Sequence, residues 1–120
     1  AMDAEAYQIS QMLVKDVGEP KNWYLDVNNA KRIGLVNESE NEENLLSIVK
    51  IITANSLCNN NYQKFKDLIG TEFNVNLYLR LSNGSVLINC IKGGGELISK
   101  ISRIVSIDDK SYGELVVWVY

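Results

Sequence analysis

The spacing of apolar residues in the second half of the chain predicts β-strands. From Phe73 to Leu81 every second residue is apolar, which is the period of a strand with one buried face. Asn83-Gly84 follows and indicates a tight hairpin with a positive φ at both residues. Three further strands are expected, at 86–91, 97–107 and 114–120. Two consecutive hairpins of this kind predict a four-stranded antiparallel meander.

The first half of the chain shows the spacing of amphipathic helices. A helix is predicted over residues 3–17, with a narrow apolar stripe made of Ala6, Ile9 and Leu13. Gly18 and Pro20 then end the helix in the expected order. The irregular segment 18–30 is expected to place Trp23 on the surface of the core.

Two more helices are predicted before the strands. Ser39 and Glu42 have the spacing of a capping box, which opens a helix over residues 41–54. Its inward face is expected to carry Leu45, Ile48, Val49 and Ile52, and Leu46 and Ile51 are expected to widen that face. A shorter helix is expected over 61–69 and ends at Gly70. Three helices packed on a meander make the chain a two-layer α+β domain.

The composition is that of one ordinary globular domain. The 120 residues are 46% hydrophobic and 22% charged, so we expect a single domain spanning 1–120 and neither a disordered nor a fibrous chain. Ala1 ahead of Met2 indicates a remnant of cloning at residues 1–2, and a helix that opens at the first residues indicates that a preceding segment was removed. No run of about 20 apolar residues predicts a membrane helix within the chain.

Charge and side-chain chemistry argue against several functions. The net charge of −3 argues against nucleic acid as a partner. Histidine is absent from the sequence, which excludes Ser-His-Asp and Cys-His catalysis and histidine metal sites. Acidic clusters at 38–43 and 108–109 are interpreted as helix and turn chemistry, and Lys92-Gly93-Gly94-Gly95 lacks the residue order of a phosphate loop. We therefore predict no enzyme, with no catalytic residues, no cofactor and no metal site.

Cys58 and Cys90 leave two interpretations open. They form a structural disulfide, which would indicate an oxidising or extracellular setting, or they stay as buried thiols that pack like small apolar side chains. Two thiols without histidine fall short of the four ligands of a structural zinc site. A disulfide would connect the central helices with the second strand of the meander.

Two Asn-X-Ser sequons make Asn37 and Asn83 candidate glycosylation sites. The motif is short and often arises by chance. In the alternative interpretation neither asparagine is modified: Asn37 belongs to a loop beside a helix cap, and Asn83 belongs to a hairpin turn. If the protein is exported, both sequons lie on exposed loops and are plausible acceptors.

The order of several short motifs resembles that of a known family. Tyr7-Gln8-Ile9-Ser10 is followed by Leu13, by Gly18-Glu19-Pro20-Lys21-Asn22-Trp23 and by Ile33-Gly34-Leu35. Further on, the stretch 61–70 leads into the strand at Phe73. In this order the motifs resemble those of the outer domains of archaeal proteins with class III signal peptides, the type IV pilin-like proteins, over residues 7–80.

The resemblance implies a noncatalytic, structural or adhesive domain on the extracellular face of the cell membrane. It would be anchored by an N-terminal helix that this chain lacks, so the membrane would be contacted only through that helix. Its partners would be other pilin-like subunits or surface components, and no nucleic acid. Within the domain, we expect Gly18, Pro20, Asn22 and Trp23 to shape the turn after the first helix and not to bind a ligand.

The alternative is an intracellular module that binds a small ligand or another protein. It predicts reduced cysteines and no membrane helix in the gene. The segment 114–120 is apolar, and if it lies at a sheet edge it would pair with a second copy to make a dimer.

Overall fold

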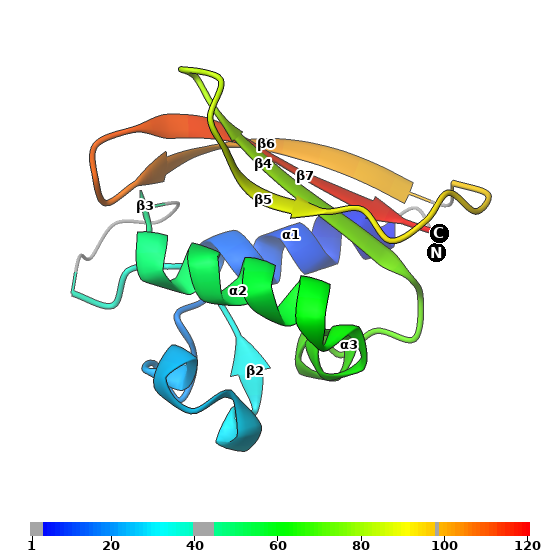
Figure 1. Ribbon diagram of the computed structural model, residues 1–120, viewed down its shortest axis with the longest axis horizontal. Coiled ribbons are helices and arrows are strands. Elements are labelled where there is room, and N and C mark those ends of the chain that lie inside the picture. Colours follow the sequence, from blue (N-terminus) through cyan, green and yellow to red (C-terminus); the bar gives the residue numbers. More distant parts are fainter. Residues whose placement is uncertain (1–3, 40–44, 98) are drawn as a thin grey trace.

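A computed structural model describes residues 4–39, 45–97 and 99–120, and this part of the chain has the α+β architecture that the sequence predicts. Its helices are α1 (Glu5–Lys15), α2 (Ile48–Asn60) and α3 (Tyr62–Ile69), with single 3-10 turns at η2 (Trp23–Leu25) and η3 (Val27–Asn29). One sheet contains β3 (Leu45–Leu46), β4 (Val75–Leu81), β5 (Val86–Cys90), β6 (Ser99–Ile107) and β7 (Tyr112–Val119). A second, small sheet pairs β1 (Gly18–Glu19) with β2 (Arg32–Ile33). Helices α1 and α2 lie on the same side of the larger sheet, and the core fills the space between them and the sheet (Figure 1).

The predicted meander is wrong in its strand order. The larger sheet has the order β3-β6-β7-β4-β5, with β3 parallel to β6 and the other pairs antiparallel. The free edge of β5 meets α2, where Asn55 Oδ1 accepts from the Asn89 amide at 3.0 Å and Asn59 Nδ2 donates to the Asn89 carbonyl at 3.1 Å. Because α2 occupies that edge, β6 cannot pair there and joins the sheet on the far side of β7.

The last strand is therefore not an edge. β7 pairs with β4 through Val75–Val119 to Leu81–Gly113, and with β6 on its other side. The predicted dimer through the segment 114–120 required an edge position, so that prediction is wrong. An interior strand has its backbone donors and acceptors paired within its own sheet.

The helix predicted over 41–54 is also wrong at its start and in its inward face. α2 begins at Ile48, where Ser47 Oγ accepts from the Lys50 amide, and the two residues Leu45 and Leu46 are a strand beside β6. Glu40 and Glu42 lie outside the described residues, and Ser39 bonds with the Asn37 side chain. The buried side chains of α2 are Lys50, Ile51, Ala54, Leu57 and Cys58. Val49 and Ile52, which were expected inside, are 48% and 56% exposed.

The helices 3–17 and 61–69 are close to their predicted ranges. Ala6, Ile9 and Leu13 are buried under the sheet, which confirms the predicted stripe of α1. Asn61 caps α3, since its side chain accepts from the Lys64 amide, and the helix ends at Gly70 as predicted.

Two hairpin turns have the same hydrogen bonds but different residues at the left-handed position. After Leu81, the Gly84 amide bonds to the Leu81 carbonyl, and φ is +94° at Gly84. After Ile107, the Lys110 amide bonds to the Ile107 carbonyl, and φ is +72° at Lys110. Asn83 keeps a negative φ, so the predicted hairpin is confirmed while its predicted positive φ at both residues is wrong. This geometry is a type I turn followed by one left-handed residue.

The paired turns give a matched test of backbone strain. Lys110→Gly is expected to raise the free energy of unfolding by about 0.5 kcal/mol, and Gly84→Ala to lower it by about 1 kcal/mol, because a side chain at positive φ is strained. A Cβ at Gly84 would meet no atom within 4 Å, so crowding does not contribute. Urea unfolding of both variants measures the changes, and a loss of stability in Lys110→Gly would contradict the strain at that turn.

Candidate functional site

The turn after α1 is organised around Trp23. Its indole is fully buried, so the expected position on the core surface is wrong, and Nε1 donates to the Gly34 carbonyl at 2.9 Å. Gly18 has φ +90°, and a Cβ there would lie 2.3 Å from the indole Cδ1. The Pro20 carbonyl accepts from the Trp23 amide at 2.9 Å, whereas Asn22 is exposed. The structure thus packs Gly18 against Trp23 and joins Pro20 to Trp23 through its backbone carbonyl, while Pro20 and Asn22 are both exposed.

Lys50, the fully buried lysine of α2, was not among the residues predicted from the sequence. Its ammonium nitrogen donates to the Val17 carbonyl and the Val36 carbonyl, both at 2.8 Å, and forms an ion pair with Glu38 Oε2 at 2.6 Å. The ring of Tyr24 lies 6.0 Å from the same nitrogen. An ammonium group has three protons to donate, and all three have a partner here. Lys50 therefore joins α2 to the segment just before β1 and to the segment after β2. Its ammonium group has no proton left for a ligand.

A second charged group, also missed, holds the small sheet from outside. Arg32 Nε bonds to Asp16 Oδ2 at 2.5 Å, and the same guanidinium contacts the Glu19 carboxylate. Partial burial raises the pKa of Asp16, but hydrogen bonds from Arg32 and the Gly18 amide outweigh it, so that pKa lies below its usual value. Partial burial likewise raises the pKa of Glu38, and the bond to Lys50 more than offsets it. These carboxylates are structural and stay charged near neutral pH.

Acid is expected to weaken the fold through these two carboxylates. A carboxylate whose folded pKa is depressed stabilises the protein above its unfolded pKa, and this contribution is lost as the pH falls through the folded pKa. The free energy of unfolding, measured with urea from about pH 7 down to about pH 2, should therefore decline below the usual carboxylate range. Asp16→Asn and Arg32→Leu should each flatten the decline, because either substitution removes the same pair. An unchanged acid profile in both variants would contradict this assignment.

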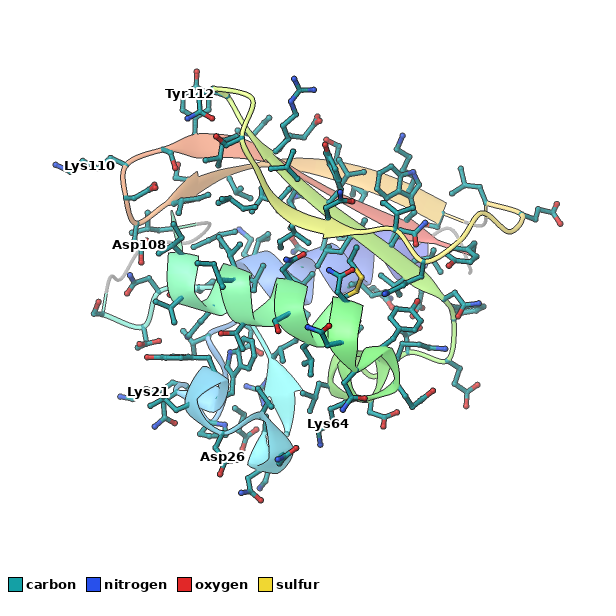
Figure 2. All side chains as sticks on the ribbon, in the orientation of Figure 1. Lys21, Asp26, Lys64, Asp108, Lys110 and Tyr112 are labelled. Carbon is teal, nitrogen blue, oxygen red and sulfur yellow. A yellow bond between two sulfur atoms is a disulfide. The ribbon has the colours of Figure 1, made fainter. Side chains whose placement is uncertain are left out.

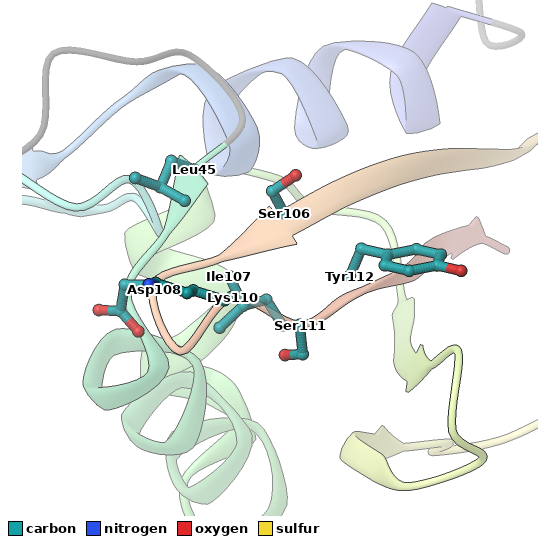
Figure 3. A pocket seen from close by; sticks show the side chains of 7 residues that line it. All are labelled: Leu45, Ser106, Ile107, Asp108, Lys110, Ser111 and Tyr112. Carbon is teal, nitrogen blue, oxygen red and sulfur yellow. The ribbon is translucent and has the colours of Figure 1, made fainter.

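A hollow of about 430 Å³ lies beside the turn between β6 and β7 (Figure 3). Its Asp108 carboxylate accepts from the Ile48 amide at 3.2 Å and from Asn37 Nδ2 at 2.9 Å, so it is committed to the start of α2. The Ser111 hydroxyl donates to Asp109, and this bond together with the Ser111 amide lowers the pKa of Asp109. A carboxylate with a lowered pKa is a weak general base near neutral pH. Asp109 is therefore poorly suited to activating the Ser111 hydroxyl.

The opposite face of the larger sheet is the more distinctive surface, because no helix of the described chain covers it (Figure 1). We call it the open sheet face. The residues on this side are Asn76, Tyr78, Arg80, Lys100, Ser102, Ile104, Glu114, Val116 and Trp118, of which Asn76 and Val116 are buried. The Lys100 ammonium lies 5.1 Å from the centre of the Trp118 ring. Ile104 is 71% exposed and borders a hollow of about 220 Å³. Apolar and aromatic side chains set among both signs of charge suit contact with a macromolecule.

The candidate residues of the other sequence motifs fall in three separate places. Cys58 and Cys90 form a disulfide with a Cα–Cα distance of 6.1 Å, which links α2 to β5 (Figure 2). Asn37 is half-buried beside Asp108, while Asn83 is exposed at the tip of the β4–β5 hairpin. These candidates form no common site, either with one another or with the turn around Trp23.

The glycine-rich loop after β5 is attached to the sheet. Asn76 Nδ2 donates to the Gly93 carbonyl at 2.9 Å, and Asn76 Oδ1 accepts from the Lys92 amide at 2.7 Å. The Lys92 ammonium bonds to the Asn59 carbonyl at 3.3 Å. The loop amide at Lys92 and the lysine side chain are thus both used within the fold.

The described residues hold no metal cluster and no membrane-spanning helix. Within residues 4–39, 45–97 and 99–120, no three His, Cys, Asp or Glu side chains lie close enough to hold a metal ion. No helix in the same ranges is long and apolar enough to cross a membrane. Comparison of the chain with protein-family models, curated proteins and solved structures finds no match.

Proposed function

We propose that this chain is the outward-facing domain of a membrane-anchored, pilin-like cell-surface protein with a structural or adhesive role. The observation that carries the proposal is the placement of α1 along the inner face of β6 and β7. The Ala6 amide bonds to Ser99 Oγ at 3.2 Å, and Arg103 Nη1 donates to Gln11 Oε1 at 2.5 Å. Contacts from the first turn and the middle of the helix therefore fix its direction relative to the sheet.

The start of α1 suits a longer helix. Ala4, the residue before it, has φ −84° and ψ −11°, which are helical values, and no side chain caps the helix there. The first amides of a helix have no partner within the helix itself, and here the Ala6 amide is already bonded to Ser99 Oγ. In our proposal an anchoring helix that enters the membrane continues into α1 and supplies acceptors for the other first-turn amides.

The disulfide and the open sheet face support the same proposal. A structural disulfide such as Cys58–Cys90 is typical of proteins outside the reducing cytosol. The open sheet face lies on the side of the sheet away from α1, so an anchoring helix that continued α1 would leave it accessible. In our proposal it is the face that contacts neighbouring subunits or an external surface.

The proposal is tested on cells that make the protein naturally. Protease added to intact cells should release the domain from the membrane-anchored protein. A thiol reagent should label Cys58 and Cys90 only after the disulfide is reduced. When membranes are extracted, the protein should partition with the lipid. Recovery in the soluble cytosolic fraction with both thiols free would overturn the proposal.

An intracellular protein-interaction module remains the second candidate, and the exposed Ile104 of the open sheet face favours it, together with the exposed Tyr112 at the start of β7. Both are large side chains more than half exposed, at 71% and 59%. Such a module would bind through the open sheet face, and the thiol labelling above separates it from the first candidate.

A further inference from the structure

The two sequons of the chain present different acceptor amides. An N-linked saccharide is attached at the side-chain nitrogen of asparagine, and its bulk requires a surface position. The state of Nδ2 in the folded protein and the room around it therefore decide whether a sequon can be modified after folding. Asn37 and Asn83 differ in both respects.

Asn83 lies in an open position. Every residue from Ser82 to Val86 is exposed, and a Cβ placed on the neighbouring Gly84 would meet no atom within 4 Å. The Asn83 Oδ1 atom accepts from the Ser85 amide at 2.9 Å, which orders the side chain at the hairpin tip. Within the described part of the chain, nothing hydrogen-bonds to its Nδ2.

The Nδ2 atom of Asn37, in contrast, already donates a hydrogen bond. Nδ2 donates to Asp108 Oδ2 at 2.9 Å, and Asp108 also accepts from the Ile48 amide at the start of α2. The middle residue of this sequon, Glu38, forms the ion pair with the buried Lys50. Transfer to Asn37 would require its amide to leave Asp108 and reach the transferase, which would disturb the start of α2, and Asn37 is half-buried where Asn83 is exposed.

We propose that Asn83 is an N-glycosylation site and that Asn37 is not. This assignment rests on the proposed function, because the saccharide donor, a lipid diphosphate-linked oligosaccharide, is used on the exported side of the membrane. In the transfer, the anomeric carbon forms a bond to Asn83 Nδ2 while its bond to the phosphate oxygen breaks. The lipid diphosphate leaves with that electron pair, and the amide nitrogen loses one of its two protons to a base of the transferase.

The folded 120-residue chain is incubated with a purified oligosaccharyltransferase and its lipid-linked donor, and the peptides are analysed by mass spectrometry. We expect saccharide on Asn83 and none on Asn37. Two unstructured peptides that carry the sequons, 31–43 and 78–90, are the matched controls, and the enzyme should modify both. Asn83→Gln and Ser85→Ala should each abolish modification of the folded chain, while Asn37→Gln should leave it unchanged.

Modification of Asn37 in the folded chain, or failure at Asn83 when its peptide is modified, would overturn the assignment. The native protein separates this result from the proposed function. If the protein is on the cell surface with its disulfide formed but Asn83 is bare, the assignment is wrong and the proposed function stands. If the protein is cytosolic with free thiols, the proposed function is wrong, and the reaction in vitro still judges the two amides.

Discussion

Replacing Lys50 with methionine is expected to lower the free energy of unfolding by about 3–5 kcal/mol, the usual cost of removing one partner from a buried charged contact. The substitution leaves the Val17 and Val36 carbonyls without their donor and Glu38 without its counter-charge. Methionine matches the aliphatic stem of lysine in length and is close to lysine in helix propensity, so α2 itself should be little affected. Urea unfolding followed by circular dichroism measures the loss.

Two control variants show how much of the stability loss comes from the burial of the ammonium group and how much from the charge of its partner. Lys64→Met removes a lysine whose contact is one long, exposed bond of 3.5 Å to the Asn28 carbonyl, and should change stability by less than about 0.5 kcal/mol (Figure 2). Glu38→Gln keeps an acceptor for Lys50 and should cost about 1 kcal/mol, because the Glu38 side chain is 30% exposed. Equal effects of Lys50→Met and Lys64→Met would contradict the role given to the buried ammonium.

Replacing Trp23 with alanine should cost about 3–5 kcal/mol, the range for truncating a large buried aromatic side chain. The indole is fully buried, and its loss would leave a cavity beside Gly18 and leave the Gly34 carbonyl without its donor. Thermal and urea unfolding of the variant give the change in stability.

Trp23→Phe is the matched variant for the hydrogen bond. It keeps an aromatic ring in the core but cannot donate to the Gly34 carbonyl, so it should cost about 1–3 kcal/mol, less than alanine. Wild-type stability in Trp23→Ala would show that this ring does not organise the turn. Equal losses in both variants would assign the effect to the hydrogen bond alone.

The sequence predicts best where one physical signal dominates. The alternation from Phe73 to Leu81 corresponds to β4, and Gly70 ends α3 with φ +81°. In both places the local pattern and the tertiary contacts favour the same structure. The stripe of α1 was predictable for the same reason, since only one of its faces is apolar.

α2 shows why local patterns fail elsewhere. Its exposed side contains Val49 and Ile52, which are as apolar as the buried Ile51 and Ala54, so periodicity alone cannot orient the helix. The deciding residue is Lys50, whose charge suggests an exposed position, whereas three acceptors from distant segments bury it. Those acceptors become neighbours only in the folded chain, so the sequence gives no local sign of them.

The strand order has a related cause. Asn83-Gly84 and the turn expected at 108–113 predict the two hairpins, but a hairpin does not specify which of its edges meets the next one. That choice depends on α2 and on Asn55 and Asn59, which occupy the outer edge of β5. Local patterns therefore could not predict which residues of the open sheet face are paired across β4, β7 and β6.

The central position of β7 has a consequence for how the chain is made. A ribosome or a translocation channel releases β4, β5 and β6 before the strand that must lie between β4 and β6. Until Tyr112–Val119 has emerged, β4 and β6 have no shared neighbour, and the inner face of the sheet cannot close over α1. The nascent domain therefore remains open until its last strand is released, and the complete fold forms only after synthesis or export of that strand.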